Sequence, residues 1–328
     1  MKTLLFLFLI ALTGVSATAQ ADLSASCTLF KGNSVSDGGL IPLNGYQVKF
    51  RSCQISGQNW VGIREFNSQN RTFVLLTEPN SFKTQIADLS CLKCNDIKLN
   101  EISNSVYKQA ITEELSTPFP LSNKGITHSK LNAGLFLTMD LCPSHKDFDY
   151  SVFENEKVKA RSEFPIAVAI SGGWMSRHER ELQWMKNQVL NRQLDIVWVN
   201  HSYTHPYKKG VPNKDNFLLG PNINFSDEVL KQEQYMISNG LTPSVFFRFP
   251  GLISNESLIR QLGQFGLLSL GSDAWLALDQ RPTPGSVILV HGNGNEEIGI
   301  RLLHKLIDGI ADMGIFKNLN QVLQSVPN

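Results

Sequence analysis

Two histidines four residues apart, His201 and His205, are the clearest chemical feature of the sequence. They stand in the stretch WVNHSYTHPY, just after an apolar run. Imidazole nitrogens are common metal ligands, so this spacing could hold one ion between two side chains. A lone H-x-x-x-H is nevertheless a weak motif, and it equally describes two polar residues of an ordinary loop. Residues elsewhere in the chain must decide between these interpretations.

Other side chains that could do acid–base or metal chemistry also follow apolar runs. Five residues have this placement: Asp140, His201, Arg248, Asp273 and His291. In a βα barrel the carboxyl ends of all strands open onto one face, where active sites lie. If the apolar runs are strands of such a barrel, these five side chains converge on one pocket. That convergence favours the metal interpretation of the two histidines.

The elements that would position these residues alternate between two patterns over the C-terminal two-thirds of the chain. Apolar runs predict buried strands at 135–139, 166–170, 196–199, 244–247, 267–270 and 287–290. Amphipathic patterns predict helices at 150–161, 177–190, 227–239, 256–265 and 297–313. Buried strands alternating with helices indicate an α/β fold with a parallel sheet, either a barrel or a doubly wound sheet.

Four stretches resemble motifs of the polysaccharide deacetylase family, carbohydrate esterase family 4: NHSYTHP, FRFPG, GSDAW and ILVHGNG. NHSYTHP fits the H-[ST]-x-x-H motif and is the most specific of the four. FRFPG is similar to R-x-P-x-G, shortened by one residue. The resemblance covers residues 131–326 and implies a distorted βα barrel. It also implies an enzyme that removes N-acetyl groups from amino sugars with a bound divalent metal, often zinc.

The resemblance implies a role for each residue that matches a motif. Four would be catalytic: Asp140 as the base, Arg248 orienting it, His291 as the general acid and Asp273 pairing with that histidine. The metal would be held by Asp140, His201 and His205. The substrate pocket would be lined by Cys142, Pro250 and Trp275. Arg248 could also be a purely structural ion-pair partner.

One motif departs from the family pattern. The family shows T-F-D-D-G-P, with the first Asp as base and the second as metal ligand, whereas this chain has TMDLCP. Asp140 keeps the base position, and Leu141 occupies the ligand position. Catalytic zinc usually has three protein ligands plus water. We therefore expect Asp140 to become the third ligand, or His145, Asp147 or Asp149 to supply one.

Two other functions fit parts of the pattern. Cys142, in the place of the family's glycine, is most simply a small buried residue. It could instead be the nucleophile of a thiol hydrolase, with His201 or His145 as base. A third hypothesis is a protein that binds cell-wall glycan on a catalytically inactive deacetylase scaffold.

The first 19 residues predict a secretory signal peptide. One lysine precedes an apolar stretch at 4–12, and an A-x-A cleavage site follows at 17–19. The apolar stretch is shorter than the roughly 20 residues that span a bilayer. We therefore expect an exported protein, periplasmic or secreted.

Residues 20–118 predict a small, mainly β accessory domain, joined by a linker at 119–130 to the barrel at 131–328. Its strands are expected at 46–50, 60–66 and 71–78. Four cysteines fall in this region: Cys27, Cys53, Cys91 and Cys94. An oxidising compartment favours two disulfides among them. The CLKC stretch could alternatively be half of a zinc ribbon or a redox pair.

Charge is nearly balanced, with 30 Lys and Arg against 29 Asp and Glu. This balance gives no electrostatic reason to expect nucleic acid as a partner. No stretch after the first 19 residues is long and apolar enough to predict membrane insertion. The partner that the resemblance implies is a glycan, peptidoglycan or chitin-like.

Overall fold

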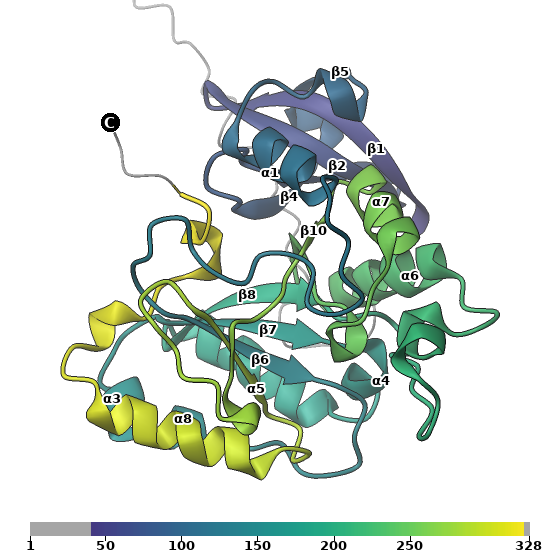
Figure 1. Cartoon of the computed structure of the whole chain (residues 1–328). Helices are drawn as coiled ribbons and strands as arrows, with labels where there is room; N and C mark the ends of the chain where they lie inside the picture. The colour runs from purple at the N-terminus through teal and green to yellow at the C-terminus, as the bar shows by residue number, and fades with distance from the viewer. Residues whose placement is uncertain (1–40, 325–328) are drawn as a thin grey trace, which may run out of the picture.

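A computed structural model describes residues 41–324 of the chain (Figure 1). The expected signal peptide at 1–19 and Cys27 lie outside the described residues. The described part contains two sheets, one antiparallel and N-terminal, the other parallel. Among its helices, none has the length and apolar character that crossing a membrane requires.

The parallel sheet confirms the predicted α/β architecture. Its seven strands lie in the order β10-β9-β8-β7-β6-β12-β11, and every neighbouring pair is parallel. The strands are β6 (Phe136–Leu141), β7 (Phe164–Ile170), β8 (Leu194–Asn200), β9 (Pro243–Phe247), β10 (Leu268–Ser269), β11 (Ala274–Trp275) and β12 (Val287–His291). The central strands β6 and β7 are buried on both faces, which explains why β7 is apolar throughout and why β6 carries only two polar residues, Thr138 and Asp140.

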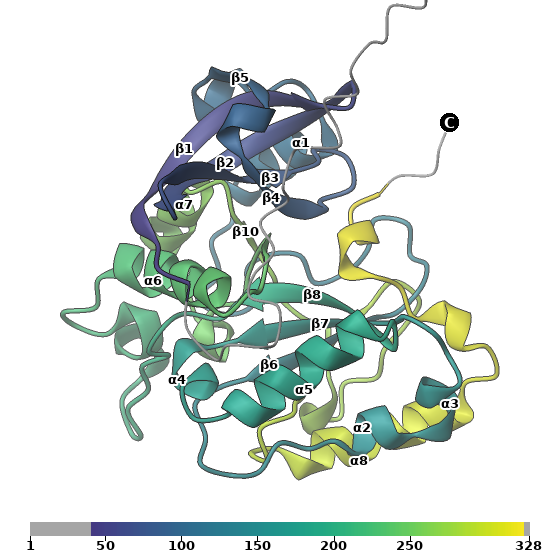
Figure 2. The same cartoon turned by 180° about the vertical axis from the view of Figure 1, so that it is seen from behind.

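Helices cover the outer face of this sheet (Figure 2). They are α4 (Gly172–Met175), α5 (Glu179–Leu190), α6 (Phe225–Ser238), α7 (Glu256–Gln264) and α8 (Glu297–Gly309). The helix predicted at 150–161 is wrong as a single element. It is split into α2 (Ser151–Glu154) and α3 (Glu156–Lys159), because Asn155 leaves helical geometry and its side chain accepts the backbone N–H of Lys157.

The barrel is open between its edge strands β10 and β11. The segment at 119–130, expected to be a linker, lies against this opening. Ile126 forms a bridge with Leu270, just after β10, and His128 forms one with Ser286, just before β12. This segment therefore packs on the barrel along its length.

The N-terminal sheet has five antiparallel strands in the order β4-β3-β2-β1-β5. They are β1 (Asn44–Ile55), β2 (Gln58–Ser68), β3 (Arg71–Thr77), β4 (Thr84–Asp88) and β5 (Lys93–Asp96), followed by α1 (Val106–Glu114). The first three match the predicted strands. Cys53 and Cys94 face each other on β1 and β5 and form a disulfide, so the zinc-ribbon and redox interpretations of CLKC are wrong.

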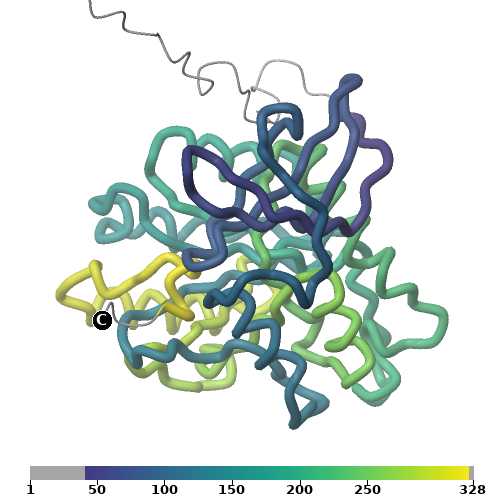
Figure 3. Tube along the Cα trace, turned by 90° about the horizontal axis from the view of Figure 1, so that it is seen from above, coloured from purple at the N-terminus to yellow at the C-terminus, as the bar shows by residue number. Residues whose placement is uncertain are grey.

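The two sheets share one hydrophobic core. Seen from above, the purple strands of the N-terminal sheet lie over the barrel (Figure 3). Phe66 and Tyr107 belong to the same buried cluster as Phe246 and Leu268 of the barrel. Residues distant in sequence therefore support the strands whose ends carry the polar side chains.

Candidate active site

Asp140 and Arg248 form a buried ion pair at the carboxyl ends of β6 and β9. Arg248 Nη1 lies 3.3 Å from Asp140 Oδ1, and its Nη2 donates to Thr138 Oγ1 at 3.0 Å. Burial by itself raises the pKa of Asp140, but Arg248, followed by the nearby histidines, outweighs it and lowers the pKa below its usual value. Asp140 is therefore held as a carboxylate.

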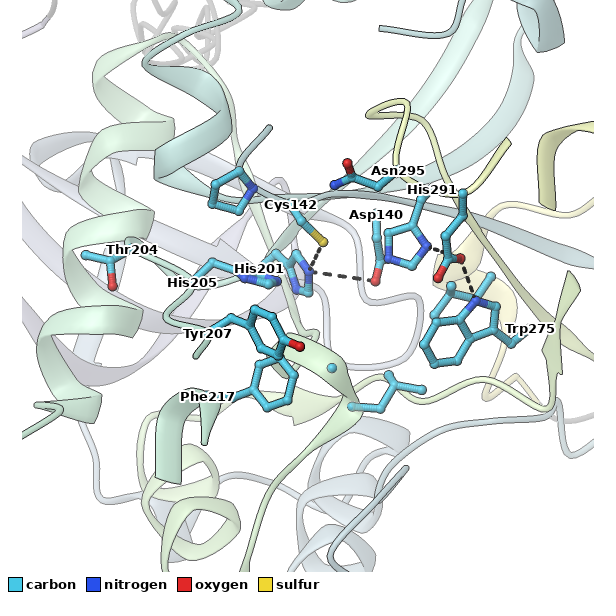
Figure 4. Close-up of a pocket in the computed structure, with 15 residues that line it drawn as sticks. Asp140, Cys142, His201, Thr204, His205, Tyr207, Phe217, Trp275, His291 and Asn295 are labelled. Carbon is cyan, nitrogen blue, oxygen red and sulfur yellow. Dashed lines mark hydrogen bonds and ion pairs between the residues drawn. The ribbon is translucent and has the colours of Figure 1, made fainter. Parts of the chain in front are cut away.

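His201 is fully buried and its ring is oriented by the backbone. Nδ1 donates to the carbonyl of Arg248 at 2.8 Å, which directs Nε2 into the pocket. Nε2 lies 3.5 Å from Cys142 Sγ and 3.7 Å from Asp140 Oδ2 (Figure 4). Burial is the main cause of the lowered pKa of His201. The ring is thus neutral, with a free lone pair on Nε2, as a metal ligand requires.

His205, Cys142 and His201 bring three donor atoms together. One nitrogen from each histidine and the Cys142 sulfur lie within 4.8 Å of one another. His205 Nε2 is buried and has no hydrogen-bond partner within residues 41–324. Two imidazoles and a thiolate form a ligand set that suits zinc. These residues therefore fit the divalent metal that the sequence motifs imply.

Cys142 supplies the third candidate donor of this group, whereas the sequence motifs imply Asp140 as the third ligand. Along an extended chain, residues i and i+2 point to the same side, so Cys142 shares a side with Asp140 while Leu141 enters the hydrophobic core. Cys142 lines the pocket, and its sulfur lies close enough to both histidines to serve as a ligand beside them. His145, Asp147 and Asp149 are not among the described residues that line the pocket.

His291 ends β12 and forms an ion pair with Glu296, with 2.8 Å between Nδ1 and Oε2. The same Glu296 oxygen accepts the indole N–H of Trp275 at 2.8 Å. Burial lowers the pKa of His291, but contacts with Cys142 and Glu296 outweigh this effect and raise it to about 10. His291 is therefore an imidazolium at neutral pH. Glu296 was not identified from the sequence because it stands in a loop without a recognisable pattern.

The expected pairing of Asp273 with His291 is wrong. Asp273 instead contacts His128, with 2.6 Å between Oδ2 and Nδ1, and accepts the backbone N–H of Val287 at 3.1 Å. Val287 begins β12 and His291 ends it. Four residues of strand span about 13 Å, so Asp273 lies near the opposite end of β12 from the histidine.

The pocket has a volume of about 430 Å³, within the usual range for ligand sites. It brings together most of the predicted site residues: Asp140, Cys142, His201, His205, Trp275 and His291. Arg248 reaches it indirectly, through Asp140. Pro250 is buried, and its neighbours Gly251 and Leu252 line the pocket in its place.

The charges inside the pocket are coupled. Burial raises the pKa of the Cys142 thiol, but His205 and His291 outweigh burial and lower it to about 7. A thiol with this pKa is partly ionised at neutral pH. Cys142 can therefore act as a thiolate ligand or, with His201 at 3.5 Å, as a nucleophile.

No protein-family model matches the sequence. Among solved structures, the chain is similar to family 4 carbohydrate esterases. One from Bacillus anthracis is 19% identical, with a TM-score of 0.45, over 67% of this chain and 93% of that chain. A peptidoglycan N-acetylglucosamine deacetylase, Bc1960, is 17% identical, with a TM-score of 0.42, over 61% and 92%. BA3943, a family 4 pseudoenzyme from Bacillus anthracis, is 13% identical, with a TM-score of 0.39, over 87% and 90%. At such identities the likeness concerns the fold alone.

Proposed function

We propose that this protein is an exported, metal-dependent hydrolase that removes N-acetyl groups from amino-sugar polymers, with the N-acetylglucosamine of peptidoglycan as the leading substrate. One observation carries the proposal. A three-donor cluster of Cys142, His201 and His205 lies in the same pocket as an ionised Asp140 and a cationic His291. The substrate class rests on the motifs of the sequence, and the cellular location rests on the expected signal peptide.

The residues of the pocket divide the chemistry between them. When bound, a divalent metal such as zinc lowers the pKa of water and polarises a carbonyl group. Cys142, His201 and His205 would hold it, which leaves Asp140 free to act as base. Asp140 accepts a proton from the attacking water, and Arg248 keeps its carboxylate ionised and fixed in position.

Cleavage of the acetamide also requires an acid. An amine leaves poorly unless it is protonated as the C–N bond breaks. His291 carries a proton at neutral pH and can donate it to the departing nitrogen. Glu296 stabilises the imidazolium and fixes its ring.

The test is acetate release from peptidoglycan and from chitin oligomers by zinc-loaded protein. His291→Ala should lower the rate by roughly 10²–10⁴-fold, as expected for loss of a general acid. The double variant His201→Ala, His205→Ala should purify without zinc and be inactive. His304→Ala is a matched control, because His304 contacts Ser151 and lies outside the pocket lining. Wild-type protein that carries zinc but releases no acetate from either substrate would favour a glycan-binding protein instead.

The same assay separates the metal hydrolase from a thiol hydrolase. The 3.5 Å contact between Cys142 Sγ and His201 Nε2 favours the thiol alternative. Chelation should abolish the activity of a metal enzyme and leave that of a thiol enzyme intact. Activity that survives chelation but is lost on treatment with iodoacetamide would support the thiol hydrolase.

A further inference from the structure

One wall of the pocket is formed by two aromatic rings that the catalytic chemistry does not use. Tyr207 and Phe217 both line the cavity, and their ring centroids are 5.2 Å apart. Tyr207 is 61% exposed. Figure 4 shows this pair on one side of His201, with Trp275 across the pocket. Exposed apolar surface next to a polar site is typical of a ligand-contact surface.

A buried asparagine fixes the backbone of the loop that carries the two rings. Asn216 is 3% exposed, and its side-chain oxygen accepts the backbone N–H groups of Lys208 (2.9 Å) and Phe217 (2.8 Å). Its amide nitrogen donates to the carbonyls of Lys208 (2.8 Å) and Val211 (3.0 Å). These four bonds close the loop between Tyr207 and Phe217, so the backbone that carries both rings is held in place by the protein itself.

The backbone beneath the rings adopts unfavourable conformations that support the same arrangement. Phe217 has a φ of +52°, which an L-residue with a bulky side chain rarely adopts. Gly251 has a φ of +62°, and a Cβ there would lie 2.5 Å from the Phe217 ring. A larger residue at position 251 would therefore force the Phe217 ring to move, because the ring packs directly against the glycine backbone. Such strain is typical of functional sites, where the surrounding structure enforces it.

We propose that Tyr207 and Phe217 form a stacking platform for the sugar unit next to the one whose acetamide enters the catalytic centre. A pyranose ring has one face of C–H groups and hydroxyls at its edge, so it can stack on an aromatic ring and keep its hydroxyls in water. The inference rests on the proposed function and deepens it. The substrate is an oligomer or polymer, and a single amino sugar leaves the platform empty.

The test compares binding of an N-acetylglucosamine tetramer with binding of the single sugar, measured by titration calorimetry in a His291→Ala background that prevents turnover. Tyr207→Ala should weaken tetramer binding about 3–10-fold and leave binding of the single sugar unchanged. Tyr207→Phe keeps the ring and should bind the tetramer like the parent protein. Leu190→Ala, an exposed apolar truncation on α5, is the control for nonspecific effects. Equal tetramer affinity of the Tyr207→Ala and parent proteins would overturn the platform.

Kinetics with an otherwise native chain separate this inference from the proposed function. Tyr207→Ala should raise KM for the tetramer while kcat, and the rate with a small acetyl ester, stay unchanged. Acetate release with a KM that does not respond to Tyr207→Ala would end the platform and leave the deacetylase standing. The reverse outcome is also distinguishable. If Tyr207→Ala weakens tetramer binding but the wild-type protein releases no acetate, the platform stands and the deacetylase proposal fails.

Discussion

At the scale of single residues, Cys142 gives the pocket a soft donor. A thiolate favours zinc over the hard cations Mg²⁺, Ca²⁺ and Mn²⁺, which prefer oxygen ligands. Because Cys142 lies within 4.8 Å of the donor nitrogens of His201 and His205, we expect the metal selectivity of the proposed site to depend on this one side chain.

The first prediction concerns this selectivity. Wild-type protein should bind Zn²⁺ more tightly than Mn²⁺, and Cys142→Ala should weaken zinc binding by at least about 100-fold, since even outer-sphere changes cost about 10–100-fold. Competition with a chromophoric zinc chelator measures the loss. Protein loaded with Co²⁺ should also show a thiolate charge-transfer absorption that Cys142→Ser removes. A cobalt spectrum that is the same in both proteins would show that the sulfur is not a ligand.

The second prediction concerns which carboxylate, Glu296 or Asp273, helps to raise the pKa of His291. The pKa of His291 is raised by Cys142 first and by Glu296 second, and Glu296→Gln removes the second contribution while it keeps an oxygen for the Trp275 indole. The acid is protonated below its pKa, so a lower pKa moves the alkaline limit of activity to lower pH. Asp273→Asn, which removes the charge beside His128, should leave the pH–rate profile unchanged. If Asp273→Asn shifts the alkaline limit and Glu296→Gln does not, then Asp273 is the partner of His291, as the sequence motifs imply.

The sequence was informative where a residue follows an apolar strand. Asp140, His201 and His291 could be identified in this way, because strand ends in a βα fold share one face. Cys142 was placed in the pocket but not recognised as a donor, although two-residue alternation from Asp140 was available as a signal. Glu296 could not be found, because no periodic pattern indicates how a loop side chain turns.

At the scale of elements, α1 joins the N-terminal sheet to the barrel through a buried carboxyl group. Glu114, the last residue of α1, accepts a hydrogen bond from Ser269 Oγ of β10 at 2.5 Å. Burial raises the pKa of Glu114 to about 7. The hydrogen bond from Ser269 favours the ionised carboxylate but does not outweigh burial, so the folded state is most stable while this carboxyl group is protonated.

The third prediction follows from the sign of that shift. The folded pKa lies above the unfolded value, so the stabilisation is complete below about pH 4.5 and is lost as the pH rises through about 7. Glu114→Gln keeps the acceptor but cannot ionise. The free energy of unfolding of wild type, relative to Glu114→Gln, should fall by about 3 kcal/mol between pH 4 and pH 8. Urea titrations at several pH values measure it, and a constant difference would refute the assignment.

Strands were easier to anticipate than helix boundaries. The central strands appear in the sequence as continuous apolar runs because both of their faces are buried. Strand β11 is only two residues long and leaves no periodic signal. The interruption between α2 and α3 depends on the Asn155 side chain capping a new helix, which amphipathic spacing does not reveal.

At the scale of the whole molecule, a buried ion pair connects the two sheets. Arg64 of β2 contacts Glu233 of α6 through two hydrogen bonds, Nε to Oε2 at 2.7 Å and Nη2 to Oε1 at 2.9 Å. Tyr46 Oη also donates to this carboxylate, at 2.9 Å. Both charged side chains are fully buried, so each depends on the other for compensation.

The fourth prediction is a large loss of stability when this pair is broken. Glu233→Gln should lower the free energy of unfolding by about 3–5 kcal/mol, because it leaves the Arg64 charge buried and unpaired. Lys231→Ala, which removes an exposed ion pair with Asp227 on the same helix, should cost less than about 1 kcal/mol. Denaturant titration should show one cooperative transition for wild type. Two separate transitions would mean that the sheets unfold independently.

The core that the two sheets share also bears on how this chain can be inherited and recombined. A crossover near residue 118 would separate Phe66 from Phe246 and Arg64 from Glu233. A chimera built there from two distant parents would join surfaces that never adapted to each other. The N-terminal sheet should therefore pass between lineages together with its barrel, and an engineer who wants to transplant the pocket must transfer both.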